Sequence, residues 1–309
     1  MGKRLILAAT GLLVGAASAD WRLVWSDEFN GTELDASKWG YEQGFIRNSE
    51  YQFYTNLPEN VRLENGCLVL QGRRVQLKNP DYVPGETNDW KRARAVLAIT
   101  SGSVNTRHRF AFTYGRVECR AKVPARKGSW PAIWTLGANI GEDGWPKCGE
   151  IDILEFYGQM PDKVTCNVHG QSVQTGKHAT PGSSELRGKT PADGFHVYAM
   201  EWTAQEVVCY YDGIRYGAFP LEAYGDAFEK PHYILLNLAL GADWMMPESE
   251  VEVDDGTRFE VDWIRVYQKE SPMADDRSGT VSANSDGSKR EDKNEEERKR
   301  NEQASSLYR

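Results

Sequence analysis

Apolar and polar residues alternate in short runs between residues 20 and 268, a pattern that suits β-strands. These runs are rich in aromatic and β-branched residues and are bounded by Gly, Pro, Asn or Asp. The expected strands are 62–73, 93–101, 107–123, 164–169, 196–202, 207–211, 233–240 and 259–267. Asn65-Gly66 and Asp212-Gly213 have the composition of tight hairpin turns. Because no long segment has helical periodicity, the pattern predicts one all-β domain, a two-sheet antiparallel β-sandwich or jelly roll.

The first 19 residues have a different pattern. Lys3 and Arg4 precede an apolar run over residues 5–15, and Ala17-Ser18-Ala19 has the small residues of a cleavage site. We interpret residues 1–19 as a secretory signal peptide, with an uncleaved N-terminal anchor as the alternative. The run is too short to span a bilayer, and no later stretch approaches about 18 uncharged apolar residues. The expected location is extracellular or periplasmic, with no membrane association after signal cleavage.

Residues 269–309 are strongly charged and nearly without aromatic side chains. They contain nine basic and ten acidic residues, and Tyr308 is their single aromatic residue. Such a composition buries too little apolar surface to offset the entropy of ordering, so we expect a charged, disordered tail. A charged helix within residues 289–305 that binds a partner weakly is the alternative.

Removal of both ends leaves residues 20–268, with 26 basic and 35 acidic residues and a formal charge of −9. This charge disfavours a general electrostatic attraction to nucleic acid or to an anionic membrane. A neutral partner suits the domain better, and we expect the domain to act as a monomer. All ten Trp residues lie within it, so the aromatic content belongs to the sandwich and to any cleft on its surface.

The chain has five cysteines and no CxxC pair, so their spacing does not indicate a zinc site. In an oxidising compartment, two disulfides and one free thiol are compatible with this number. Five buried, unpaired cysteines are equally compatible, and the sequence assigns the cysteines no chemistry. They are Cys67, Cys119, Cys148, Cys166 and Cys209.

Residues 149–156, GEIDILEF, set three carboxylates among large apolar side chains. Successive side chains of a strand point to opposite faces, so Glu150 and Asp152 share one face and Glu155 has the wrong parity. A β-bulge at Ile153-Leu154 would return Glu155 to the acidic face. Two such carboxylates could act as the nucleophile and the acid/base of a retaining glycosidase, which lie about 5–5.5 Å apart. The alternatives are a decorated surface strand and a site for a hard cation.

Several further segments, together with this strand, resemble glycoside hydrolase family 16, the laminarinase and lichenase group. They are residues 25–31, 100–102, 114–118, 128–134, 195–202, 211–213, 236–238 and 262–267, in the expected order. The resemblance covers nearly all of residues 20–268. It implies two stacked antiparallel sheets with a concave substrate cleft, and retaining hydrolysis of internal β-glycosidic bonds without a catalytic cofactor.

The resemblance also implies a role for each carboxylate. Glu150 matches the nucleophile, Asp152 the assisting aspartate and Glu155 the general acid/base. The spacing ExDxxE is similar to the bulged laminarinase form and differs from the shorter lichenase form, ExDxE. The family assignment and the parity of the strand therefore agree on the same three residues.

Aromatic and polar side chains are expected to bind the sugar in the cleft. By resemblance, Trp130 and Trp145 are the aromatic candidates. Trp134 lies an even distance from Trp130, so it either shares the cleft face or packs in the core. His169 matches a family position beside the acid/base, and a structural histidine is the alternative.

A polar segment near the start of the domain adds three more candidates. Asn48, Glu50 and Gln52 alternate within residues 47–55 and resemble a laminarinase segment that contacts the glycone end of the substrate. Because one alternating stretch is common, an ordinary polar strand face is the alternative.

Some members of the family hold a structural calcium on the convex face. The matching positions are Glu28 and Gly66, through their backbone carbonyls, and Asp262, through its side chain. Hard oxygen ligands suit calcium, but Asp262 could equally cap a turn.

The resulting hypothesis is a secreted endo-1,3-β-glucanase that acts on laminarin-like and also mixed-linkage 1,3-1,4-β-glucan. Agarases, porphyranases and carrageenases of the same fold share ExDxxE, so a galactan hydrolase is the main alternative. The domain charge of −9 disfavours a sulfated galactan, whereas Lys91, Arg92 and Arg94 form a local basic cluster. A transglycosylase and a non-catalytic glucan-binding protein are further alternatives, and the retained carboxylates argue against the latter.

Overall fold

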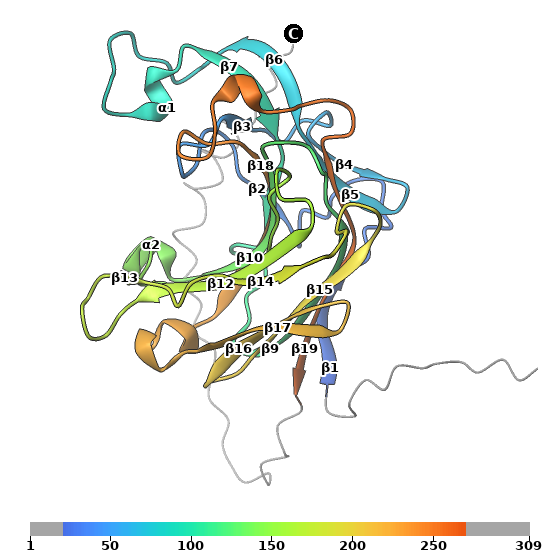
Figure 1. Ribbon diagram of the computed structural model, residues 1–309, viewed down its shortest axis with the longest axis vertical. Coiled ribbons are helices and arrows are strands. Elements are labelled where there is room, and N and C mark those ends of the chain that lie inside the picture. Colours follow the sequence, from blue (N-terminus) through green and yellow to red (C-terminus); the bar gives the residue numbers. More distant parts are fainter. Residues whose placement is uncertain (1–20, 270–309) are drawn as a thin grey trace, which may run out of the picture.

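The computed structural model describes residues 21–269, which form two stacked antiparallel β-sheets and a small third sheet (Figure 1). The expected signal peptide lies outside the described residues, as does the expected tail except for its first residue. No helix within residues 21–269 is long and apolar enough to cross a membrane. The predicted all-β sandwich is confirmed.

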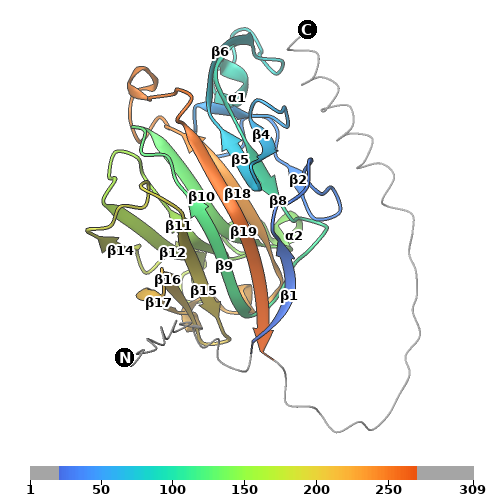
Figure 2. The ribbon, with the colours of Figure 1, turned by 90° about the vertical axis from the view of Figure 1, so that its right-hand side faces the viewer.

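The first sheet, called the outer sheet here, has eight strands, and its long strands β9 and β19 lie side by side (Figure 2). β1 pairs with β19 beside the main path of the sheet. The order along this path is β17 (Ile214–Pro220), β16 (Glu206–Tyr211), β15 (His196–Trp202), β9 (Gly115–Lys122), β19 (Arg258–Lys269), β5 (Cys67–Gln71) and β4 (Val61–Glu64), with β1 spanning Trp21–Asp27.

The second sheet, called the cleft sheet here, also has eight strands and carries the acidic segment at its centre. β14 (Ser184–Arg187) pairs with β12 beside the main path. The order along this path is β13 (His178–Ala179), β12 (Lys163–Gln171), β11 (Glu150–Glu155), β10 (Ser129–Gly137), β18 (His232–Leu240), β8 (Ser103–Asn105) and β2 (Gly40–Tyr41).

A three-stranded sheet stands at one end of the sandwich, where Figure 1 shows β6, β7 and α1 together. Its order is β3 (Gln52–Tyr54), β7 (Val96–Ser101) and β6 (Arg73–Lys78), and β3 runs parallel to β7. The helices of the described chain are single turns. They are α1 (Trp90–Ala93), α2 (Ile140–Asp143) and the 3₁₀ turns η1 (Glu222–Tyr224), η2 (Ala227–Glu229) and η3 (Glu248–Glu250).

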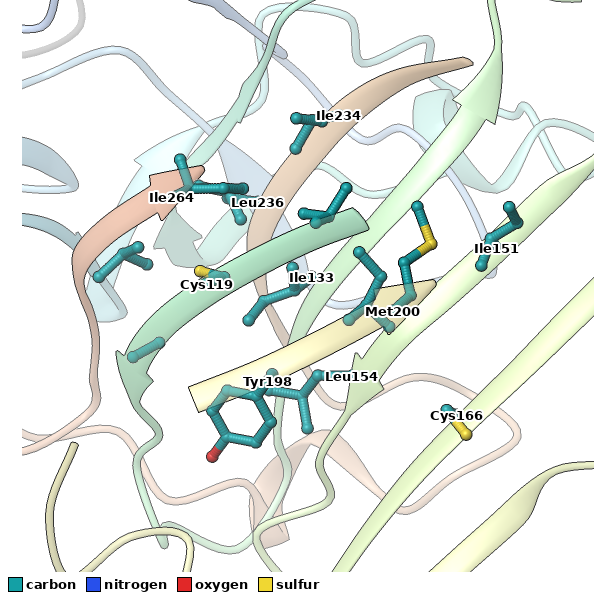
Figure 3. Packing of buried hydrophobic residues seen from close by; sticks show 14 of the residues in the cluster. Cys119, Ile133, Ile151, Leu154, Cys166, Tyr198, Met200, Ile234, Leu236 and Ile264 are labelled. Atoms are coloured by element: carbon teal, nitrogen blue, oxygen red, sulfur yellow. The ribbon is translucent and has the colours of Figure 1, made fainter. Parts of the chain in front are cut away.

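The main core lies between the two large sheets, and Figure 3 shows side chains from both of them interdigitating. Each fully buried aliphatic side chain contributes about 1.5–3 kcal/mol by leaving water. The cleft sheet supplies Ile133, Ile151, Leu154, Cys166, Ile234 and Leu236, and the outer sheet supplies Cys119, Tyr198, Met200 and Ile264. All five cysteines are buried and free, so no disulfide supports this core.

Most of the expected strands are confirmed, with errors at residues 93–95, where α1 ends at Ala93 and β7 begins at Val96, and at residues 107–114. The strand predicted over residues 107–123 begins only at Gly115. His108 and Tyr114 have positive φ angles of 64° and 58°, a conformation that a strand does not allow. Both predicted hairpins are present: Asn65-Gly66 joins β4 to β5, and Asp212-Gly213 joins β16 to β17, with positive φ at all four residues.

Candidate active site

The acidic strand β11 contains the bulge that its sequence predicts. Asp152 and Glu155 pair with Asn167 and Thr165 of β12, so three steps along β11 oppose two along β12. The register with β10 shifts at the same place. The two residues between Asp152 and Glu155 are both fully buried. The extra residue therefore returns the Glu155 side chain to the face that carries Glu150 and Asp152.

All three carboxylates line a pocket of about 380 Å³ on the cleft sheet. β10, β11 and β18 form its floor, and the loop before β3 and the loop before β11 contribute further side chains. The aromatic and apolar walls suit a sugar ring, whose faces are apolar and whose edges need hydrogen-bond partners. The lining residues are Arg47, Asn48, Glu50, Trp130, Ala132, Trp134, Leu136, Ile140, Trp145, Glu150, Asp152, Glu155, Asn237 and Ala239.

Glu150 lies at the start of β11 and receives a hydrogen bond from an indole. Trp145 Nε1 donates to Glu150 Oε2 over 2.8 Å. Burial and the charge of Asp152 raise the pKa of Glu150 to about 8, against the opposing effects of His169 and of the Trp145 hydrogen bond. The Trp145 N–H stabilises the ionised form of Glu150, which is the form a nucleophile needs.

Glu155 has two hydrogen-bond donors, both aromatic. Trp130 Nε1 lies 3.0 Å and the Tyr157 hydroxyl 3.2 Å from the same oxygen, Oε1. Burial raises the pKa of Glu155, and these two donors partly oppose the shift. A carboxyl with a raised pKa keeps its proton at mildly acidic pH, as a general acid must.

Asp152 lies between the two glutamates and is 4% exposed. It is hydrogen-bonded to Glu150, and its Oδ2 lies 3.2 Å from His169 Nε2. Burial, followed by the charge of Glu155, raises the pKa of Asp152 well above its usual value, and the hydrogen bond with Glu150 opposes this shift in part. Because three carboxyls share one buried cluster, they cannot all be ionised together, and the hydrogen bond between Asp152 and Glu150 requires a proton.

His169 is placed differently from the expectation. It pairs with Glu150 across β11 and β12, whereas Glu155 pairs with Thr165. Its Nε2 contacts Asp152, and its effect on Glu155 is electrostatic only. His169 therefore contacts the assisting carboxyl Asp152 and not Glu155, because Glu155 lies further along β11 and pairs with Thr165, four residues from His169.

Trp130, Trp134 and Trp145 all line the pocket, as the resemblance implies for the first and last. Trp134 belongs to the cleft face and is 6% exposed, because its Nε1 donates to Asn237 Oδ1 over 2.7 Å and the Arg47 guanidinium covers its ring at 5.0 Å. Trp145 is 50% exposed at the rim of the pocket.

The polar segment does not form the continuous strand that its alternation suggests. Asn48 and Ser49 have φ angles of 58° and 52°, and β3 begins only at Gln52. Asn48 and Glu50 line the pocket, but Gln52 does not. Gln52 instead donates to Glu50 Oε2 over 2.5 Å and accepts from the Leu240 backbone N–H over 2.8 Å, so it positions Glu50 from behind.

Four residues near the pocket were not expected from the sequence. Arg47 and Asn237 line it, and Tyr157 reaches Glu155 because it lies two residues further along on the same face. Trp244 is 59% exposed and stands edge-on to Trp130, at 5.3 Å and 89°. The period of two in the sequence could have indicated Tyr157. No local pattern indicates the others, because Arg47 and Trp244 lie on loops and Asn237 lies on β18, a strand far away in the sequence.

The residues matched to calcium lie at the outer sheet. Asp262 of β19 forms an ion pair with Arg120, and the Glu28 side chain forms two hydrogen bonds with Arg265. Asp262 is the only residue of the expected calcium site that would bind through its side chain, and Arg120 already neutralises its carboxylate. These residues fit calcium poorly, because Asp262 would have to exchange Arg120 for the ion.

A second group has metal-ligand types. Among the described residues, ligand atoms of Glu150, Asp152 and His169 lie within 4.8 Å of one another. Their contacts with one another and with Trp145 already engage these atoms, and we assign the group to acid–base chemistry.

Comparison with known proteins agrees with this geometry. The family model described as glycosyl hydrolases family 16 matches residues 48–265. The chain belongs to this family. The predicted resemblance is thus confirmed, and with it the assignment as a glycoside hydrolase that needs no catalytic cofactor.

Three relatives align with most of the chain. A beta-glucanase of Rhodothermus marinus is 35% identical over 80% of this chain and 85% of that protein. A glucan endo-1,3-beta-glucosidase A1 of Niallia circulans is 31% identical, and a keratan-sulfate endo-1,4-beta-galactosidase of Sphingobacterium multivorum is also 31% identical. These two cover 82% and 84% of this chain, which spans 39% and 59% of their respective lengths.

Two solved structures have the same fold. The laminarinase catalytic domain of Thermotoga maritima superimposes with a TM-score of 0.67 and 33% identity, over 82% of this chain and all of that domain. A structure reported with endo-acting O-glycanases of the human gut microbiota that initiate mucin breakdown has a TM-score of 0.73 and 37% identity, over 82% of this chain and 92% of that one.

Proposed function

We propose that this family 16 chain is a retaining endo-β-glycosidase that hydrolyses internal bonds of 1,3-β-glucan by double displacement. The observation that carries the proposal is the bulge in β11, which sets Glu150, Asp152 and Glu155 on one face inside an aromatic-lined pocket. The similarity to a beta-glucanase, an endo-1,3-beta-glucosidase and a laminarinase supports glucan as the substrate.

The first step forms a covalent glycosyl-enzyme. Glu150 attacks the anomeric carbon while Glu155 gives its proton to the departing glycosidic oxygen. Trp145 supports the negative charge on Glu150 before the attack. Asp152, protonated and hydrogen-bonded to Glu150, holds the nucleophile in position without adding a second buried negative charge.

The second step returns both glutamates to their starting states. Glu155, now ionised, accepts a proton from a water molecule that attacks the anomeric carbon and releases Glu150. The N–H of Trp130 and the hydroxyl of Tyr157 both point at Glu155 Oε1 and stabilise its ionised form between the two steps. Two inversions at the same carbon give net retention of configuration.

A β-galactosidic substrate is the second candidate, and a specific comparison favours it. The O-glycanase-related structure has both a higher TM-score and a higher identity than the laminarinase domain, and a keratan-sulfate endo-1,4-beta-galactosidase is among the relatives. The basic cluster offers little to a sulfated chain, because the Arg94 guanidinium already contacts Asp243 at 3.2 Å and lies over the ring of Tyr51.

The test is a panel of polysaccharides followed by linkage and anomer analysis of the first products. Laminarin, barley β-glucan, lichenan, keratan sulfate, mucin O-glycans and agarose would be incubated with the protein, and the anomer would be read by ¹H NMR before mutarotation. We expect β-anomeric oligosaccharides from laminarin. Activity confined to a galactose-containing substrate would replace glucan by the second candidate, and α-anomers would overturn retention.

Three further expectations belong to this proposal. We expect a secreted protein, with residues 1–19 removed as a signal peptide, and mass spectrometry of the N-terminus of the mature protein tests this. We expect a monomer, tested by light scattering. A structural calcium near Asp262 predicts a higher melting temperature in calcium than in EDTA, and because Arg120 already pairs with Asp262, a small difference is expected.

A further inference from the structure

His178 lies outside the pocket but contacts two residues that support the catalytic carboxyls. It belongs to β13, the edge strand next to β12 (Figure 1), and it is exposed. Its Nε2 lies 3.0 Å from His169 Nδ1, and the two imidazole rings stack at 5.2 Å. Its ring also packs on Trp145 at 4.6 Å. His169 contacts Asp152, and Trp145 donates to Glu150.

The hydrogen bonds around His169 determine which of its nitrogens carries the proton. Asn167 Oδ1 accepts from the Val168 backbone N–H over 2.9 Å and from Thr180 over 2.8 Å. The amide NH₂ of Asn167 therefore points at His169 Nε2, 3.1 Å away. A neutral His169 that accepts at Nε2 carries its proton on Nδ1 and donates it to His178 Nε2.

The tautomer of His169 with its proton on Nδ1 affects the protonation state of Asp152. A bare Nε2 lone pair faces Asp152 Oδ2 at 3.2 Å, and the structure gives that oxygen no hydrogen-bond donor. An ionised Asp152 would set its negative charge against this lone pair, whereas a protonated Asp152, whose proton lies in the hydrogen bond with Glu150, would not. With the proton on Asp152, Glu150 is free to be the ionised member of the cluster, as a nucleophile must be.

We propose that His178 is a positioning residue, which accepts a hydrogen bond from His169 and thereby favours the proton on Asp152 over the proton on Glu150. This inference rests on the retaining mechanism proposed above. The charged or titratable groups that act on His169 are Glu150, Asp152 and Glu155 of β11 and His178 of β13. His169 and Trp145 are the groups placed against His178.

Acidification has a defined effect in this arrangement. A protonated His178 cannot accept, so its Nε2–H donates to His169 Nδ1 and the His169 proton moves to Nε2, facing Asp152. The ionised form of Asp152 is then favoured, and its charge disfavours ionised Glu150. Partial burial lowers the pKa of His178, which favours its neutral, accepting form.

The kinetic test compares His178→Phe with His178→Gln. Phe keeps an aromatic ring against Trp145 and removes the acceptor, whereas Gln keeps an acceptor that does not titrate. We expect the acid limb of kcat/KM to move up by about one pH unit in His178→Phe, which lowers kcat/KM about tenfold below the limb. His178→Gln should retain the wild-type limb or extend it to lower pH. His196→Gln, at the outer sheet where His196 pairs with Asp193 and Asp212, is the matched control and should leave the profile unchanged.

A spectroscopic test needs no variant and no substrate. Long-range ¹H–¹⁵N NMR of the wild-type imidazoles at neutral pH should show His169 protonated on Nδ1 and bare at Nε2. A proton on His169 Nε2, or a His178→Phe profile identical to wild type in an active enzyme, would overturn the role of His178. Failure of wild type to hydrolyse any polysaccharide of the panel would instead overturn the proposed function, and the tautomer would still be read.

Discussion

Trp130 donates its indole N–H to Glu155, with 3.0 Å between Nε1 and Oε1. The two residues are 25 positions apart and lie on the neighbouring strands β10 and β11. The Trp130 side chain therefore has two roles, because its ring lines the pocket and its N–H stabilises the ionised form of Glu155. The donor lowers the pKa of Glu155 against the larger effect of burial.

Trp130→Phe tests this relationship. Loss of the N–H removes an interaction that favours ionised Glu155, so the pKa of Glu155 rises further. A general acid is active while protonated, and the basic limb of kcat/KM should therefore move up by about one pH unit. The measurement is the pH profile on laminarin. Trp134→Phe is the control, because its N–H bonds to Asn237 and not to a carboxyl, and an unmoved limb in Trp130→Phe would contradict the assignment.

Glu150→Gln should abolish turnover and make the stability of the folded domain less dependent on pH. The pKa of Glu150 is raised to about 8, so folding favours its protonated form. Stability is then greatest below the unfolded pKa and falls as pH rises towards 8. A neutral Gln removes this dependence, and at pH 8 the melting temperature should exceed that of wild type by about 2–4 °C, or about 1 kcal/mol.

Melting temperatures of both proteins at pH 5 and pH 8 check this prediction. The two proteins should differ less at pH 5, where wild-type Glu150 is largely protonated. Glu206→Gln of β16 is a matched control, because Glu206 lies on the outer sheet away from the pocket. Equal slopes for wild type and Glu150→Gln would show that burial of this carboxyl does not cost stability.

Trp244→Ala should weaken substrate binding with little effect on chemistry. Trp244 is exposed and stands at right angles to Trp130, so the two rings form a corner next to the acid/base. Loss of one stacking face worth about 1 kcal/mol raises KM about fivefold, and kcat should stay within about twofold. Steady-state kinetics on laminarin of defined length measure both. Ile214→Ala, an exposed apolar residue of β17, should change neither, and a fall in kcat alone would reject a binding role for Trp244.

Arg47→Met should destabilise the domain more than an ordinary ion-pair deletion. The Arg47 guanidinium pairs with Glu42, lies near Glu50 and covers the Trp134 ring. Removal of one partner from a largely buried pair leaves uncompensated charge, at a cost of about 3 kcal/mol.

Urea unfolding provides the measurement for this substitution. Arg187→Met is the control, because Arg187 also pairs with a glutamate, Glu185, but is 62% exposed, and its loss should cost less than about 1 kcal/mol. Equal losses for the two variants would show that the Arg47 pair is no stronger than a surface pair.

Local sequence was sufficient for the strands, the two hairpins and the bulge. Alternation with a period of two is a property of each strand by itself, and the wrong parity of Glu155 could be corrected only by an extra residue between it and Asp152. The same local reasoning failed at residues 107–114 and at Asn48, where positive φ angles interrupt patterns that are typical of strands.

The amino-acid sequence by itself determined the catalytic strand and its three carboxyls. The spacing of these carboxyls, and the face of the strand to which each one points, depend on only six consecutive residues. Only the tertiary structure decided which neighbouring side chains contact these carboxyls and shift their pKa values. The register between β11 and β12 places His169 opposite Glu150 and not Glu155, and β13 brings His178 against His169 and Trp145. Such contacts depend on strand register and loop position, which the packing of the whole sandwich sets and no local pattern encodes.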